Sequence, residues 1–176
     1  MRYNISKVKT YARFIFKQIT IIPRSGSFTN EMVYRQKDIV DIYTQKNELL
    51  ISEKRVMNIL KPVLPDMRML DIGVGGGRTT QHFGQLAKEY VGIDYSPEMI
   101  KKCQERFPEG ISNITFKLCD ARSMKVFDDS TFDFILFSLN GIDMVSHEDR
   151  LKIFKEVQRI GKTDAYFCFS SHNLQF

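Results

Sequence analysis

Short apolar runs alternate with longer amphipathic stretches along most of the chain. The apolar runs predict buried strands, and the amphipathic stretches between them predict helices. We expect five strands, at Arg68–Ile72, Tyr90–Ile93, Ile114–Leu118, Phe132–Leu139 and Ala165–Phe169. Helices are expected at Leu49–Leu60, Arg78–Lys88, Pro97–Arg106 and His147–Ile160. Strands that alternate with helices form a mostly parallel sheet with helices on both faces, which is the doubly wound α/β fold class.

The first 30 residues differ from the rest of the chain in charge. They carry six basic side chains and no acidic one, whereas the remainder has 20 basic and 21 acidic residues, so this segment supplies the net charge of +5. Apolar residues recur in it at helical spacing, at Ile5, Val8, Ala12, Ile15, Ile19 and Ile22. We therefore divide the chain into a basic amphipathic helix with its linker, residues 1–30, and a core domain, residues 31–176.

Three roles suit the N-terminal helix. We favour packing of its apolar face against the body of the protein or against a second subunit, which would make a homodimer. Alternatively, residues 1–22 lie on a membrane surface as a peripheral contact, or they form an organelle-targeting presequence, although such presequences are richer in serine. Because basic residues are not spread over the core, no nucleic-acid partner is expected.

The composition is that of a soluble globular protein, with 43% hydrophobic and 27% charged residues. No apolar run approaches the roughly 18 residues that a membrane-spanning helix needs. The cysteines, Cys103, Cys119 and Cys168, are far apart in the sequence and form no CxxC pair. This spacing predicts a reducing compartment, the cytoplasm, with neither a disulfide framework nor a metal site.

A glycine-rich turn follows the first predicted strand. The segment from Asp71 to Arg78 reads Asp-Ile-Gly-Val-Gly-Gly-Gly-Arg. Glycines allow positive φ and let a ligand approach the backbone, and ligands of doubly wound sheets bind at the carboxyl ends of strands. A dinucleotide fingerprint needs its third glycine where Arg78 stands, and a P-loop needs a Gly-Lys pair that is absent. A nucleotide-dependent oxidoreductase is therefore disfavoured.

Acidic residues end or follow the next two strands. Asp94 comes 17 residues after Gly77, at the tip of the second strand. Its two carboxylate oxygens can accept hydrogen bonds from both hydroxyls of a ribose. Asp120 follows the third strand in the same way. Either acid alone could be a helix cap or a turn former, but their joint placement at successive strand ends after a glycine turn is much harder to obtain by chance.

Together these segments resemble the class I S-adenosylmethionine-dependent methyltransferases, over about residues 40–172. The Asp-x-Gly-x-Gly-x-Gly segment is similar to that family's first motif, and Asp94–Met99 to its second. The resemblance implies a Rossmann-like fold with S-adenosylmethionine as the cofactor. The cofactor contacts that it implies are Asp71, Gly73, Gly75, Gly77, Asp94, Tyr95, Met99, Asp120, Ala121, Ser138 and Leu139, together with Tyr43 as an aromatic laid over the cofactor.

The acceptor of the methyl group is not named by the sequence. The fourth strand is followed by Ser-Leu-Asn-Gly rather than the Asn-Pro-Pro-Tyr type of motif found in many nucleic-acid methylases, so a small molecule is the expected acceptor. Methyl transfer is an in-line displacement that depends mainly on orientation, and a general base is needed only for an acceptor that must lose a proton. Asp143 and His172 are candidates for that base. The alternative is a non-catalytic S-adenosylmethionine-binding subunit or inactive relative.

The C-terminal end of the chain predicts an incomplete core. In the methyltransferase family two more strands follow the fifth, but only seven residues follow Phe169 here. Seven residues are too few for two strands and a turn. We expect Ala165–Phe169 to be an apolar edge strand that another chain or a missing segment covers.

Overall fold

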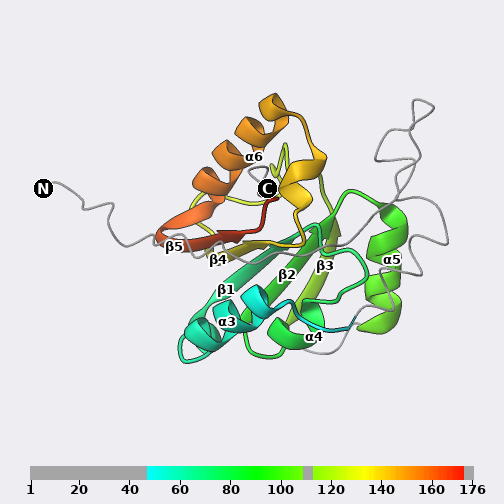
Figure 1. The fold of residues 1–176 in the computed structure, drawn as a ribbon, viewed down its shortest axis with the longest axis vertical. Coiled ribbons are helices and arrows are strands. Elements are labelled where there is room, and N and C mark those ends of the chain that lie inside the picture. Colours follow the sequence, from blue (N-terminus) through cyan, green and yellow to red (C-terminus); the bar gives the residue numbers. More distant parts are fainter. Residues whose placement is uncertain (1–46, 109–112, 173–176) are drawn as a thin grey trace, which may run out of the picture.

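A sheet of five parallel strands, in the order β3-β2-β1-β4-β5, forms the centre of the molecule. The computed structural model describes residues 47–108 and 113–172, which Figure 1 shows in colour. The strands are β1 (Arg68–Ile72), β2 (Glu89–Asp94), β3 (Ile114–Leu118), β4 (Phe132–Phe137) and β5 (Gly161–Phe169). The helices are α3 (Ile51–Leu60), α4 (Thr80–Phe83), α5 (Pro97–Arg106) and α6 (His147–Ile160), with short 3-10 helices η2 (Leu64–Asp66) and η3 (Gly141–Met144). The predicted doubly wound α/β class is confirmed.

The strand order reverses between β1 and β4. The chain moves outward from β1 to β2 and β3, then crosses the sheet to β4 on the other side of β1 and continues to β5. Because all the pairings are parallel, the carboxyl ends of the five strands lie at one edge of the sheet. The reversal point at this edge is where such folds bind ligands.

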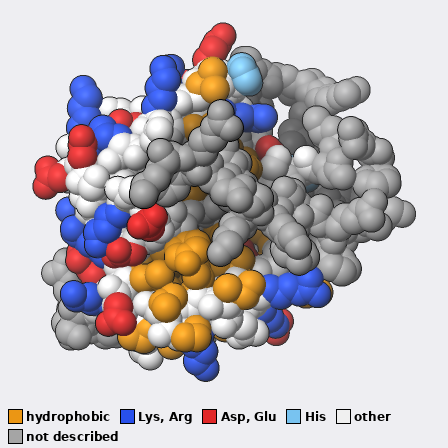
Figure 2. Space-filling model, turned by 90° about the vertical axis from the view of Figure 1, so that its left-hand side faces the viewer, with side chains coloured by type: hydrophobic (Ala, Val, Ile, Leu, Met, Phe, Trp, Pro, Cys, Tyr) orange, Lys and Arg blue, Asp and Glu red, His pale blue; other side chains and the backbone are white. Residues whose placement is uncertain are grey.

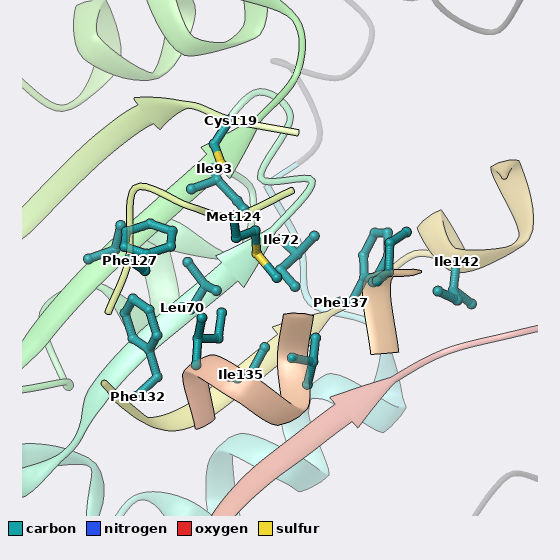
Figure 3. Packing of buried hydrophobic residues seen from close by; sticks show 14 residues of the cluster. Leu70, Ile72, Ile93, Cys119, Met124, Phe127, Phe132, Ile135, Phe137 and Ile142 are labelled. Carbon is teal, nitrogen blue, oxygen red and sulfur yellow. The ribbon is translucent and has the colours of Figure 1, made fainter. Parts of the chain in front are cut away.

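Helices cover both faces of the sheet, as Figure 1 shows. Alternate residues of a strand point to opposite faces, so neighbouring residues of β1 enter different clusters. Leu70 and Ile72 pack on the face covered by α6, where Figure 3 shows core side chains pointing toward one another. Met69 packs on the opposite face, with Leu60 of α3 and Phe83 of α4.

Five predicted elements have other bounds in the structure: α3 begins two residues later, β2 is one residue longer at each end, and three others differ as follows. The helix predicted at 78–88 is a single turn, Thr80–Phe83. The Gly84 carbonyl and the Lys88 N–H, which a helix to Lys88 would pair with each other, instead bond to the Asn113 amide and the Leu64 carbonyl. The fourth strand ends at Phe137, before residues of positive φ. The fifth strand starts at Gly161, directly after α6, and is longer than predicted.

Several predictions lie outside the described residues: the helix and linker of residues 1–30 with their membrane or subunit contacts, and Tyr43. Within the described residues, no helix has the length and apolar character to span a membrane. Figure 2 shows hydrophobic side chains gathered on the face at the left of Figure 1. Tyr166 and Phe169 of β5, an edge strand of the described sheet, are about half exposed.

Candidate functional site

The glycine turn after β1 adopts the backbone conformation that its sequence predicts. Gly73, Gly75 and Gly77 have φ of +67°, +55° and +79°, in the left-handed region that glycine tolerates best. The Cys103 thiol donates a hydrogen bond to the Gly75 carbonyl, with a sulfur–oxygen distance of 3.0 Å. The backbone remains accessible at Gly73, which is exposed, and at Gly75, which is half-buried. A ligand can therefore lie against the peptide units of this turn.

Asp94 lies beside the glycine turn at the end of β2. The Gly75 backbone N–H donates to Asp94 Oδ2 over 3.0 Å, and the Ser96 N–H donates to Oδ1 over 2.9 Å. These two bonds fix the orientation of the carboxylate, which is only 8% exposed. Burial raises the pKa of Asp94 above its ordinary value, although the backbone hydrogen bonds act in the opposite direction. A carboxylate has about four acceptor positions, so Asp94 retains capacity for a ligand's hydroxyl groups.

A small hollow opens next to Asp94. It has a volume of about 270 Å³ and is lined by Tyr95, Leu118, Cys119, Asp120 and Arg122. Its size suits part of a ligand, such as one ring system, rather than a whole drug-sized molecule. Asp120 forms an ion pair with Arg122, with 2.6 Å between Nη2 and Oδ2, which lowers the pKa of Asp120 despite its partial burial. Arg122 was not among the predicted site residues, although its position two residues after Asp120 suits such a contact.

Besides Asp94, two predicted cofactor contacts have buried side chains. Asp71 is 1% exposed, and its Oδ2 accepts hydrogen bonds from the hydroxyls of Thr79 and Tyr90. Met99 is 2% exposed on α5. Neither side chain lines the hollow. Ala121 is partly buried and packs against the core cluster under α6.

Arg78 has a structural partner that the sequence did not reveal. Its guanidinium forms a bidentate ion pair with Glu53 of α3, with nitrogen–oxygen distances of 2.5 Å and 2.7 Å. Arg78 is 7% exposed and Glu53 4%. The pair ties α3 to the glycine turn across 25 residues of sequence, a separation that no local motif encodes. Arg78 Nη2 also donates to the Ser138 hydroxyl at the end of β4, over 3.2 Å.

The chain turns sharply after β4. Leu139 and Asn140 have φ of +53° and +58°, values that are uncommon for residues with a side chain. Strained backbone of this kind occurs at functional sites. Ser138, Leu139 and Asn140 are all partly exposed at the carboxyl edge, next to the end of β1.

The structure brings together the two residues predicted as candidate bases. His172 Nδ1 lies 2.8 Å from Asp143 Oδ2, although 28 residues separate them in sequence. Asp143 lies in η3, after β4, and His172 follows β5. The sequence placed each at the carboxyl edge of the sheet but gave no sign of their contact. Asn140, whose amide lies 3.1 Å from His172 Nε2, was missed.

Comparisons with known proteins identify the family. The profile of a family described as a methyltransferase domain matches residues 69–164, more than half of the chain. The uncharacterized methyltransferase YcgJ of Bacillus subtilis (strain 168) is 32% identical over 108 residues, which are 60% of this chain and 40% of that protein. The mitochondrial ubiquinone biosynthesis O-methyltransferase of Homo sapiens is 33% identical over 97 residues, 53% of this chain and 25% of that protein.

Solved structures agree with this result. The PH0226 protein from Pyrococcus horikoshii OT3 superposes with a TM-score of 0.57 at 30% identity, over 72% of this chain and 60% of that one. The YcgJ structure gives 0.60 at 29% identity, over 69% of this chain and 50% of that one. The chain thus spans 40% and 25% of the length of the two curated relatives above. The glycine turn, Asp94 and the hollow all lie within the matched residues, and the chain belongs to the methyltransferase domain family, as its resemblance to the class I S-adenosylmethionine-dependent methyltransferases predicted.

Proposed function

We propose that this chain binds S-adenosylmethionine across the carboxyl ends of β1, β2 and β3 and transfers its methyl group to a small-molecule acceptor. The observation that carries the proposal is Asp94, a buried carboxylate that two backbone N–H groups orient beside an accessible glycine turn. A ribose with two hydroxyl donors satisfies the remaining acceptor positions of such a carboxylate.

The other groups at this edge suit the rest of the cofactor. The accessible backbone of Gly73, which is exposed, and of Gly75, which is half-buried, accommodates the methionine part, since a side chain there would narrow the approach. The hollow beyond Asp94 accommodates a flat ring between Tyr95 and Leu118, both of which are exposed. Asp120, on the rim of the hollow, is an acceptor for an amino group once Arg122 moves aside. This assignment of contacts is the one that the resemblance to class I S-adenosylmethionine-dependent methyltransferases implies, and the chemistry of the groups is compatible with it.

When bound, S-adenosylmethionine supplies a methyl group on a positively charged sulfonium. The task of the chain is then to bind and orient, because alignment of the reacting atoms can supply roughly 7–11 kcal/mol of the barrier. The hydrogen bonds of Gly75 and Ser96 to Asp94 fix the ribose end. The turn at Leu139 and Asn140 lies at the same edge of the sheet, after β4 and next to the end of β1, and this is where we place the entry of the acceptor.

A small molecule is the acceptor class that we favour. The human and Pelagibacter ubique relatives are named ubiquinone biosynthesis O-methyltransferases, at 33% and 27% identity.

Calorimetry with S-adenosylmethionine and its demethylated product tests the proposal. We expect Asp94→Ala to weaken binding by about 1.5–3 kcal/mol, the range for hydrogen bonds to a charged group. Asp133→Ala is the matched control, because Asp133 lies near the amino end of β4, at the opposite edge of the sheet. Unchanged affinity in Asp94→Ala would remove Asp94 from the site. Absence of binding by the wild-type chain would refute the proposed function.

A further inference from the structure

His172 and Asp143 form a fixed pair at the carboxyl edge of the sheet. Besides the 2.8 Å contact between His172 Nδ1 and Asp143 Oδ2, the His172 backbone N–H donates to Oδ2 over 2.7 Å. The Ser171 hydroxyl donates to Oδ1 over 2.8 Å, and Arg150 of α6 lies 4.0 Å from the same oxygen. The Asp143 side chain is 15% exposed, whereas that of His172 is 56% exposed. The carboxylate is thus held in place, and the imidazole faces solvent.

The partners of the imidazole define its tautomer. Partial burial alone would raise the pKa of Asp143, but the hydrogen bonds from His172 and Ser171 lower it below the ordinary value, so Asp143 is ionised at neutral pH. An ionised carboxylate only accepts hydrogen bonds, so Nδ1 carries the proton that it donates to Asp143. In the neutral ring, Nε2 then carries a lone pair. The Asn140 Nδ2 group, 3.1 Å away, is a donor that matches this lone pair.

Packing at β4 places the pair beside the glycine turn. The ring of Phe137 lies between two glycines: a Cβ at Gly73 would be 3.3 Å from its Cε2, and a Cβ at Gly141 would be 2.2 Å from the same atom. Gly141 opens η3, which carries Asp143. The backbone N–H of Asn140 donates to the Ser170 hydroxyl over 2.8 Å, which joins this turn to the end of β5. The segments that carry the pair therefore adjoin the turn proposed to hold the methyl donor.

We propose that His172, oriented by Asp143, is the general base of this methyltransferase, and that its acceptor is therefore a hydroxyl compound, such as a phenol. This inference rests on the proposed function. A neutral amine attacks with its own lone pair and needs no base at that stage. A hydroxyl group is a weak nucleophile until its proton is removed.

The reaction balances with the groups present. The hydroxyl oxygen forms a bond to the methyl carbon while the carbon–sulfur bond breaks, and the electron pair of that bond stays on sulfur. The hydroxyl proton passes to His172 Nε2 and makes the ring a cation, which the Asp143 carboxylate stabilises. Asn140 yields its place at Nε2 to the acceptor. No further reactant is required.

The rates of methylation of phenol and 4-nitrophenol, with S-adenosylmethionine as the donor, distinguish a general base from a structural residue at His172. At about pH 8 phenol is protonated, whereas 4-nitrophenol is largely ionised and needs no base. We expect His172→Gln to lower kcat for phenol about 100-fold or more, to lower that for 4-nitrophenol far less, and to leave the Kd for S-adenosylmethionine unchanged. Added imidazole should restore part of the phenol activity. Asp143→Asn should act in the same direction, and His147→Gln, an exposed histidine at the start of α6, should change neither rate.

Each contrary outcome has its own meaning. Equal losses for the two phenols in His172→Gln would make His172 a structural residue and overturn the proposal. The proposal is also overturned if the wild-type chain binds S-adenosylmethionine but methylates neither phenol. That result would leave the proposed function standing. Failure to bind S-adenosylmethionine would refute the proposed function itself.

Discussion

Asp71 carries an ionisable group in the interior of the protein, so the stability of the fold should depend on its protonation. Burial raises the pKa of Asp71 from its ordinary value of 3.8 to about 6, although hydrogen bonds from Thr79 and Tyr90 act in the opposite direction. Between these two pH values the folded state binds more protons than the unfolded state. The contribution of Asp71 to stability therefore falls as the pH rises from about 4 to about 6 and stays constant above that.

The size of this effect follows from the shift in pKa. One pKa unit corresponds to about 1.36 kcal/mol, so a shift of roughly two units gives about 3 kcal/mol. The substitution Asp71→Asn removes the ionisable group but retains a carbonyl oxygen that can accept from Thr79 and Tyr90. Relative to the wild type, Asp71→Asn should therefore become more stable by about 3 kcal/mol as the pH rises from about 4 to about 7.

Urea unfolding followed by circular dichroism, at several pH values in this range, measures the difference. Asp133→Asn is the control, because the same change is made where hydrogen bonds and the charge of Lys162 lower the pKa. Its difference from the wild type should change little between about pH 4 and pH 7, because a pKa lowered from 3.8 makes the contribution of Asp133 depend on pH mainly below about 4. A difference between Asp71→Asn and the wild type that does not vary with pH would refute this account of Asp71.

Two further predictions concern the elements that hold the glycine turn. Arg78→Met leaves Glu53 buried without its partner and should lower the free energy of unfolding by about 3–5 kcal/mol. The double substitution Arg78→Met with Glu53→Leu should lower the free energy of unfolding by less than that. Additive losses of the two single substitutions, measured by urea unfolding, would contradict the coupling. Gly77→Ala should destabilise the fold by about 1–3 kcal/mol more than Gly75→Ala. Both residues have positive φ, but a Cβ at Gly77 lies 2.6 Å from the Phe107 ring and one at Gly75 meets nothing closer than 4.0 Å; equal losses would show that the ring moves aside.

Periodicity predicted the elements of the sheet well. The strands Arg68–Ile72 and Ile114–Leu118 and the helices Pro97–Arg106 and His147–Ile160 have the predicted ends. In these elements the local pattern and the tertiary contacts agree. The helix after the glycine turn was predicted too long, because the Gly84 carbonyl bonds to Asn113 and the Lys88 N–H to Leu64, both distant in sequence. Nothing in the local sequence carries that information.

The candidate site shows the same division between local and distant information. The conformation of Gly73 and Gly75 follows from residue type, and the place of Asp94 follows from its strand. The partners of each side chain could not be predicted from the local sequence, because they come from other elements. From the sequence, Arg78 was interpreted only as a residue that excludes a dinucleotide motif. In the structure its ion pair with Glu53 links α3 to the glycine turn.

Four aspartates near the carboxyl edge illustrate why residue type alone cannot assign a role, since the surroundings of a carboxyl group decide its protonation and its partners. Asp71 is enclosed by two hydroxyl groups, Asp120 is paired with Arg122, and Asp143 is paired with His172. Asp94 differs, because within the described part of the chain its partners are backbone N–H groups and it takes part in no ion pair. Its negative charge is therefore oriented but not neutralised by a cation. A ligand that brings both hydroxyl donors and a positive charge compensates such a group better than a neutral nucleoside, and this is the chemistry of a sulfonium cofactor.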